Sequence, residues 1–421
     1  MDHADFDGWF SQALSDLCVQ YAYAAEDSFV SADSMFFFEI CVSLQIMDTG
    51  LFFEMLERDS TTSCEGGLAD FLAGRLDGQG RCVETFEVES MRESCPPGAS
   101  VPKNVLVSWG DPKVFFCTHL DTVPPYIAPV EGPDQVVHGR GTCDAKGQIS
   151  AMYEACKTLE AKGCTDFALL LLAGEETGSF GAKAFNGMFA QKYADRDIVV
   201  IVGEPTDNCM ASASKGTKSF EVTFRGEAFH SGYPEHGVSA VELFNDFMNA
   251  LRSIVFPLDD VLGETTWNIG RLSSDNPQNI LSDSLSCRVY FRTTFESDEM
   301  VCNVMKNIAG PDARLRFGKR TVQDGSDVVA KGVAEWQRRM TVKAFGGDTP
   351  TMYETLEGFP TKPVAFGSDA PQLKLFRRKI LCGPGSILVA HRDEERICLS
   401  EIGKAADNYV RMYEQLVEKL I

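Results

Sequence analysis

The segment FFCTHLD, residues 115–121, is an apolar run that ends abruptly in a histidine and a carboxylate two residues apart. FALLLLAGEETG (167–178) and DIVVIVGEPTD (197–207) have the same form, in which a run of mainly apolar residues stops at acidic side chains. Buried parallel strands have this pattern. Between the first two, GQISAMYEACKTLEAKG (147–163) repeats its apolar residues at helical spacing and predicts a crossover helix. These segments predict an α/β domain with a mixed, largely parallel sheet.

The pattern changes at about residue 214. SFEVTFRG (219–226) and SLSCRVYFRTTF (284–295) alternate as half-buried strands do, and helical segments are predicted at 240–254 and 298–309. A short strand in ARLRFGK (313–319) completes a β-α-β-type module, after which KPVAFGSDAPQ (362–372) and KILCGPGSILVAH (379–391) return to the buried-strand pattern. We therefore predict an N-terminal extension over 1–48 and a catalytic domain over 49–213 and 322–421, interrupted by an inserted α+β domain over 214–321.

The composition and charge of the chain argue against some classes of binding partner. The chain has 421 residues and a formal net charge of -22, so we expect it to repel nucleic acid and anionic membranes. The N-terminus lacks the basic and long apolar regions of a secretory signal, and charged residues interrupt the most apolar window, 35–56. We expect a cytoplasmic enzyme or binding protein.

Metal-ligand side chains gather where the predicted strands end. The carboxyl ends of strands form the functional rim of an open α/β sheet. The residues expected at this rim are His119, Asp121, Asp144, Glu175, Glu176, Glu204 and His391. Nitrogen and oxygen donors of this kind suit zinc, cobalt or manganese, and a shared carboxylate allows a dinuclear site.

Spacing suggests separate roles for some of these residues. Asp121 lies on the same side of an extended chain as His119 and could accept its second imidazole N–H. Adjacent glutamates on a regular strand cannot both point at one metal, so one of Glu175 and Glu176 would be a ligand and the other a base acting on metal-bound water. Each piece also has a plainer interpretation: a polar pair for the histidine and aspartate, a solvated turn for the glutamates, and a packed thiol rather than a ligand for Cys143. It is the combination that favours a metal site.

Five motifs then occur in the order and spacing of a known family: HLDTVP, GRGTCDAKG, AGEETGSFGAKAF, VGEPT and GPGSILVAHRDEE. They resemble the dizinc aminoacylase and carboxypeptidase family, from about residue 51 to the C-terminus. GPGSILVAHRDEE and AFGSDAP look most like its acetylornithine deacetylase branch, which acts in arginine biosynthesis. The family also includes succinyl-diaminopimelate desuccinylase.

The resemblance implies a zinc-exopeptidase-like fold with two zinc ions, which cobalt or manganese can replace. By position, His119 and Glu204 would hold one ion, Glu176 and His391 the other, and Asp144 would bridge them. Glu175 would be the general base. Asp121 would orient His119, as its spacing suggested independently.

The inserted domain would be a ferredoxin-like lid and a homodimer interface. Its motif GEAFHSGYPEHGVSA implies that His230 stabilises the oxyanion of the partner subunit's substrate; the plainer interpretation is a cap for the helix that follows. Asn279 and Arg292 lie where family members contact the substrate. Leu281 stands in this contact loop where the family's motif has a proline.

The function implied is a zinc-dependent amidohydrolase that removes an N-acyl group from an amino acid such as N-acetylornithine. A dipeptidase or carboxypeptidase on the same site is the first alternative. A desuccinylase would need cationic lid groups, and Lys215, Lys218, Arg271 and Arg292 are available. A non-catalytic scaffold is the remote alternative.

Overall fold

The computed structural model describes residues 49–308 and 335–418. The N-terminal extension and the strand predicted in 313–319 lie outside these residues. No helix in the described ranges is long and apolar enough to cross a membrane.

A six-stranded mixed sheet forms the catalytic domain, in the order β1-β2-β6-β3-β7-β15. β1 and β2 are antiparallel to each other, β2 is antiparallel to β6, and β6, β3, β7 and β15 run parallel. The mixed, largely parallel sheet predicted from the sequence is therefore confirmed. Its strands are β1 (Cys82–Glu87), β2 (Lys103–Gly110), β3 (Val114–His119), β6 (Asp166–Leu172), β7 (Val199–Val202) and β15 (Arg378–Leu381).

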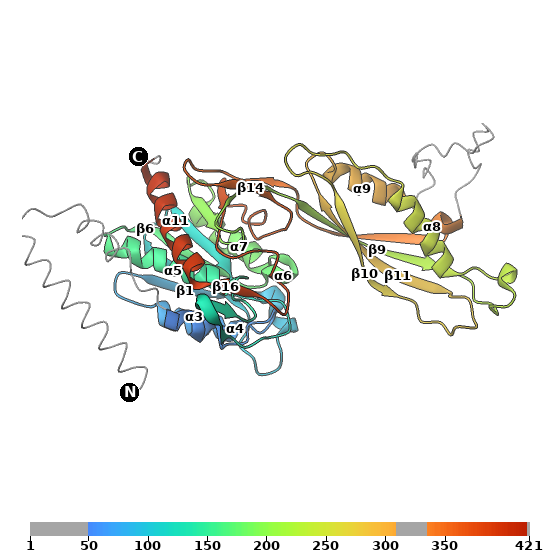
Figure 1. Cartoon of the computed structure of the whole chain (residues 1–421), viewed down its shortest axis with the longest axis horizontal. Coiled ribbons are helices and arrows are strands. Elements are labelled where there is room, and N and C mark those ends of the chain that lie inside the picture. The colour runs from blue at the N-terminus through green and yellow to red at the C-terminus, as the bar shows by residue number, and fades with distance from the viewer. Residues whose placement is uncertain (1–48, 309–334, 419–421) are drawn as a thin grey trace, which may run out of the picture. The chain divides into compact units, whose positions relative to one another are not determined.

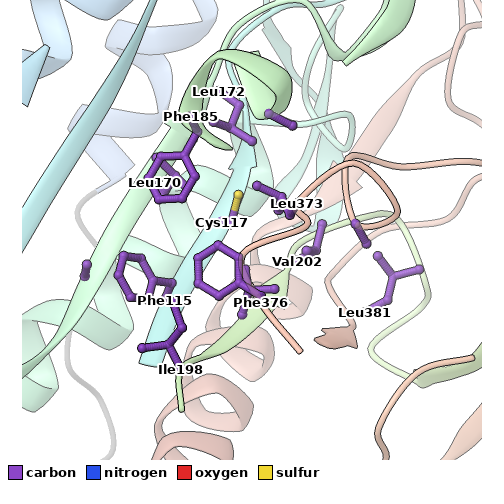
Figure 2. Packing of buried hydrophobic residues seen from close by; sticks show 14 of the residues in the cluster. Phe115, Cys117, Leu170, Leu172, Phe185, Ile198, Val202, Leu373, Phe376 and Leu381 are labelled. Atoms are coloured by element: carbon purple, nitrogen blue, oxygen red, sulfur yellow. The ribbon is translucent and has the colours of Figure 1, made fainter. Parts of the chain in front are cut away.

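Alternate residues of β3 point to opposite faces of this sheet, as in any strand. Phe115 and Cys117 join Phe185 of α7 (Phe180–Tyr193) in a buried cluster on one face, which Figure 2 shows. Phe116 packs on the other face, with its ring centroid 5.9 Å from that of Tyr409 in α11 (Leu399–Glu418). The predicted crossover helix is α5 (Lys146–Ala161), which packs beside α11 (Figure 1).

Smaller elements surround the sheet. The apolar segment at 362–372 does not join it, because β14 pairs in parallel with β8 in a separate three-stranded sheet. The smaller elements of the catalytic domain are α3 (Thr49–Leu56), α4 (Gly66–Leu76), α6 (Glu175–Gly178), the 3-10 helices at Glu89–Ser94 and Pro133–Gln135, and strands β4 (Val130–Glu131), β5 (Val136–His138), β8 (Met210–Ser214), β13 (Thr351–Met352), β14 (Thr361–Val364) and β16 (Arg396–Cys398). A further 3-10 helix, Pro234–His236, belongs to the inserted domain.

The inserted domain is an antiparallel sheet, β10-β11-β9-β12, with α8 and α9 packed on it (Figure 1). Its chain order, β-α-β-β-α-β, is ferredoxin-like, as predicted. The predicted end of the insert at residue 321 is too early, because β12 pairs with β9. The elements are β9 (Gly216–Arg225), α8 (Ala240–Arg252), β10 (Thr266–Ser273), β11 (Ser284–Thr293), α9 (Asp298–Asn307), α10 (Glu335–Arg338) and β12 (Met340–Gly346).

Candidate metal centre

Asp144 lies between two imidazoles at the carboxyl edge of the parallel strands. Its Oδ1 is 2.9 Å from Nε2 of His119, which ends β3. Its Oδ2 is 3.3 Å from Nε2 of His391, and that nitrogen is 3.1 Å from Oε1 of Glu176. One carboxylate therefore reaches both histidines, one oxygen to each.

Ligand atoms gather here in two groups that share Asp144. His119, Asp144 and Glu204 form one group, and Asp144, Glu176 and His391 form the other, with the donor atoms within each group lying within 4.8 Å of one another. The structure thus brings together, in the same two sets, the five residues that the family resemblance implies as metal ligands.

The GEET segment is a helical turn, not a strand end. Gly174 has φ of 71°, and a Cβ there would lie 2.5 Å from Sδ of Met91, so only glycine fits. α6 begins at the next residue. As a result Glu175 and Glu176 both come close to His119, within one further group of potential ligand atoms. The argument that a regular strand separates the two glutamates does not apply, because the backbone there is helical.

Asp121 holds the same turn. Its carboxylate accepts the backbone N–H groups of Glu175 at 3.0 Å and Glu176 at 3.2 Å, and the hydroxyl of Thr62 at 2.9 Å. The predicted orienting role of Asp121 was assigned to its carboxylate, but a different atom lies nearer His119. The backbone carbonyl of Asp121 lies 2.8 Å from Nδ1 of His119, whereas the carboxylate is 3.6 Å away.

Burial and like charges disturb the ionisation of these groups. Burial, and then the charge of Glu204, hold the pKa of Glu175 well above its ordinary value. Burial also raises the pKa of Glu204 well above its usual range, although His119 opposes this. Burial would lower the pKa of His119, but the nearby carboxylates of Asp121 and Asp144 raise it well above its ordinary value.

A pair of cations fits this donor set. Buried carboxylates are tolerated where they are paired with charge or coordinate a metal, and here two imidazoles face a larger number of acids. Imidazole nitrogen and carboxylate oxygen suit divalent zinc, cobalt and manganese. The shared position of Asp144 suits two ions rather than one.

The sequence analysis did not identify two acidic residues that lie near the metal centre, Glu395 and Asp369. Glu395 is buried, and its Oε1 accepts the backbone N–H groups of Gly141, Cys143 and Asp144 at 2.9, 3.2 and 3.2 Å. Its Oε2 is 2.6 Å from Nη1 of buried Arg140. Asp369 is also buried, and burial raises its pKa to about 7. Within the sequence, an acid inside AHRDEE and another inside AFGSDAP gave only a weak signal, since neither follows a strand of the main sheet.

Cys143 is a packed thiol. Its side chain is buried, its Sγ lies 3.8 Å from the carbonyl oxygen of Ser386, and burial raises its pKa well above the ordinary value. It is absent from the groups of potential ligands among the described residues.

The predicted lid residues lie in the inserted domain. His230 is exposed and its Nδ1 accepts the backbone N–H of Gly232, and the carbonyl oxygen of Asn279 accepts the N–H of the neighbouring Ser231. Helix α8 is capped by Ser239, which excludes the capping role for His230. Arg292 lies on β11, with its guanidinium 5.1 Å from the ring centroid of Tyr290. No described contact joins His230 or Asn279 to the metal ligands in residues 49–308 and 335–418.

A sequence model described as peptidase family M20/M25/M40 matches residues 115–415. The chain belongs to this family. It is therefore a hydrolase of the M20 peptidase family, which confirms the sequence-based resemblance at the level of the family.

Similar proteins from fungi align with most of the chain. A probable carboxypeptidase of Aspergillus flavus is 28% identical over 395 residues, which cover 87% of this chain and 86% of the relative. A probable carboxypeptidase of Aspergillus terreus is 32% identical over 327 residues, covering 72% of this chain and 70% of the relative.

Solved structures share the fold. A tripeptidase from Staphylococcus aureus has a TM-score of 0.66 at 18% identity and covers 86% of this chain and 95% of its own. A Bacillus subtilis protein described as a dinuclear metal binding peptidase has a TM-score of 0.57 at 11% identity, covering 88% of this chain and 97% of its own. At these identities the likeness shows the fold alone.

Proposed function

We propose that the protein is a metal-dependent carboxypeptidase or dipeptidase that cleaves a peptide bond next to a free carboxylate. The observation that carries the proposal is the position of Asp144 between His119 and His391, with Glu204 and Glu176 completing two groups of ligands. The names of the fungal relatives, which are probable carboxypeptidases, favour a peptide substrate.

We propose two zinc ions as the native metal pair, with cobalt or manganese able to replace them. His119 and Glu204 would hold one ion, Glu176 and His391 the other, and Asp144 both. When bound, the metal pair supplies Lewis-acid polarisation of the scissile carbonyl and the attacking water.

Side chains of the protein then transfer the proton from the attacking water to the leaving group. Glu175 takes it from the attacking water and delivers it to the nitrogen of the leaving amine. Because Asp121 accepts the backbone N–H groups of Glu175 and Glu176, it fixes the base relative to a ligand. His230 would stabilise the oxyanion, and Asn279 and Arg292 would contact the substrate's carboxylate or backbone.

Deacylation of an N-acyl amino acid is the second candidate. The segments GPGSILVAHRDEE and AFGSDAP, which resemble the acetylornithine deacetylase branch, favour it. Both reactions break an amide bond next to a free carboxylate, so the same metal centre and base serve either one.

We also propose a homodimer that forms through the inserted domain, and a cytoplasmic location. The apolar side chains of Phe229, Tyr233 and Val241 are partly exposed on and before α8, which supports an interface there. Sedimentation of the full chain tests the dimer, and a species with the mass of one chain at micromolar concentration would contradict it.

The function is tested by release of free amine from dipeptides, N-acetyl amino acids and N-succinyl amino acids, with the zinc-loaded protein and its Glu175→Gln variant. Release from dipeptides that depends on Glu175 supports the proposal. Release from N-acetylornithine alone would favour the deacetylase. No release from any substrate would overturn both and revive the scaffold alternative.

A further inference from the structure

A groove of about 650 Å³ opens beside the metal centre on the side of Glu176. Glu176 forms part of its wall, so a ligand in the groove lies next to a group that also contacts His391. The volume is within the range of small-molecule sites. Most of the exposed lining is apolar, and hydroxyl groups punctuate it, from Thr62, Ser63, Ser90, Ser94 and Thr177.

Apolar side chains complete the lining. Val123, Pro124 and Phe180 contribute to it, and Phe180 packs against the small buried cluster of Val88, Met91 and Ala173. The groove therefore has an apolar part with fixed packing beneath it, and hydroxyl groups that can accept or donate hydrogen bonds without adding charge.

No lysine or arginine lines the groove, as far as the described residues go. The nearest cations along the chain are already engaged: Arg92 pairs with Glu87 and Glu89, and Lys183 donates to the carbonyl oxygen of Gly178. The one ionisable group in the lining, among the described residues, is the acid Glu176. An anionic group placed here would lose part of its hydration and would meet the acid Glu176 rather than a cationic side chain.

We infer that this largely apolar groove, with its uncharged hydroxyl groups, binds the acyl side of the scissile bond and selects an uncharged residue there. This rests on the proposed function. The substrate has a free carboxylate on its leaving side, which a cationic side chain binds most strongly, and the mainly apolar groove provides none. The side chain on the acyl side has no such requirement. An aliphatic or aromatic residue fits the lining, whereas glutamyl or succinyl groups do not.

The test compares three dipeptides that share a C-terminal phenylalanine: Gly-Phe, Leu-Phe and Glu-Phe. The zinc-loaded wild type should hydrolyse Leu-Phe with a higher kcat/KM than Glu-Phe. Ser90→Trp fills the groove and should lower kcat/KM for Leu-Phe about tenfold while changing Gly-Phe by less than about twofold. Ser90→Lys adds a cation and should raise the ratio of Glu-Phe to Leu-Phe about threefold.

Glu93→Trp is the matched control, because Glu93 is exposed on the same short helix but does not line the groove. This control variant should leave kcat/KM for each of the three dipeptides within about twofold of the wild-type value. If Ser90→Trp lowers kcat/KM equally for Gly-Phe and Leu-Phe, or lowers it for neither, the groove does not bind the acyl side. The inference then fails while the proposed function stands. If none of the dipeptides is hydrolysed by the wild type, the proposed function fails and the inference falls with it.

Discussion

Glu395 accepts the backbone N–H of Asp144 through Oε1 at 3.2 Å and pairs with Arg140 through Oε2 at 2.6 Å. Both side chains of the ion pair are about 2% exposed or less. Glu395 also follows His391 by four residues in the chain. One buried carboxylate thus connects the loop that presents the bridging aspartate with the loop that presents a histidine ligand.

We expect Glu395→Gln to lower the free energy of unfolding by about 3 kcal/mol, because the amide keeps the shape but leaves the Arg140 guanidinium buried without a counter-charge. Metal affinity should fall by about tenfold or more, since an amide has a single acceptor oxygen and cannot hold both Arg140 and the backbone N–H of Asp144 as the carboxylate does. Urea unfolding and competition with a chelating dye measure the two effects.

Glu394→Gln is the control for this change. Glu394 is 63% exposed and pairs with exposed Arg392, so its loss should change stability by less than about 0.5 kcal/mol. Equal effects of the two variants would show that Glu395 has no special role in holding the loop.

Glu175→Gln should reduce kcat by about 10² to 10⁴-fold while both metal ions stay bound. The amide cannot take a proton from water, and Glu175 lies outside the two ligand groups that share Asp144. Steady-state kinetics and metal analysis of the same preparation measure this. Full turnover by the variant would rule out Glu175 as the base.

His391→Ala should remove one of the two metal ions and leave the other. His391 contacts Asp144 and Glu176, whereas the second group, with His119 and Glu204, does not depend on it. His138→Ala is a matched control, because His138 is an exposed histidine on β5. Elemental analysis should give about half the wild-type metal content for the first variant and an unchanged content for the second. Loss of both ions would mean that the groups are not independent.

The sequence was sufficient to predict those features of the fold and the site that depend on patterns within a short segment. The apolar run at 115–119 predicts β3, and the acids and histidines after successive strands meet at one edge because those strands are parallel. Features that depend on distant partners were missed. Arg140 and Glu395 are 255 residues apart, and nothing in either segment indicates the other. The helical turn at Glu175 follows Gly174, whose left-handed backbone lies close to Met91, and a strand pattern does not reveal this.

Glu65 tests how the burial of a carboxyl group makes the stability of the protein depend on pH. It precedes α4, is fully buried, and burial and then the charge of Asp121 raise its pKa from an ordinary value of 4.5 to about 8. A carboxyl whose pKa is raised on folding stabilises the protein while it is protonated, and this stability is lost as pH rises through the folded-state pKa. In the metal-free protein, stability should therefore fall by roughly 3 kcal/mol between pH 5 and pH 8 on account of this group.

Glu65→Gln should remove this dependence, because the amide does not ionise. Near pH 5 the variant and wild type should unfold at similar urea concentrations, and near pH 8 the variant should be the more stable of the two. Glu57→Gln, at an exposed position shortly before it, should follow wild type at both values. If Glu65→Gln loses stability with rising pH as steeply as wild type, then the ionisation of Glu65 does not cause the loss, and backbone groups such as those of Ser63 and Gly174 must hold its pKa near the ordinary value against burial and the charge of Asp121.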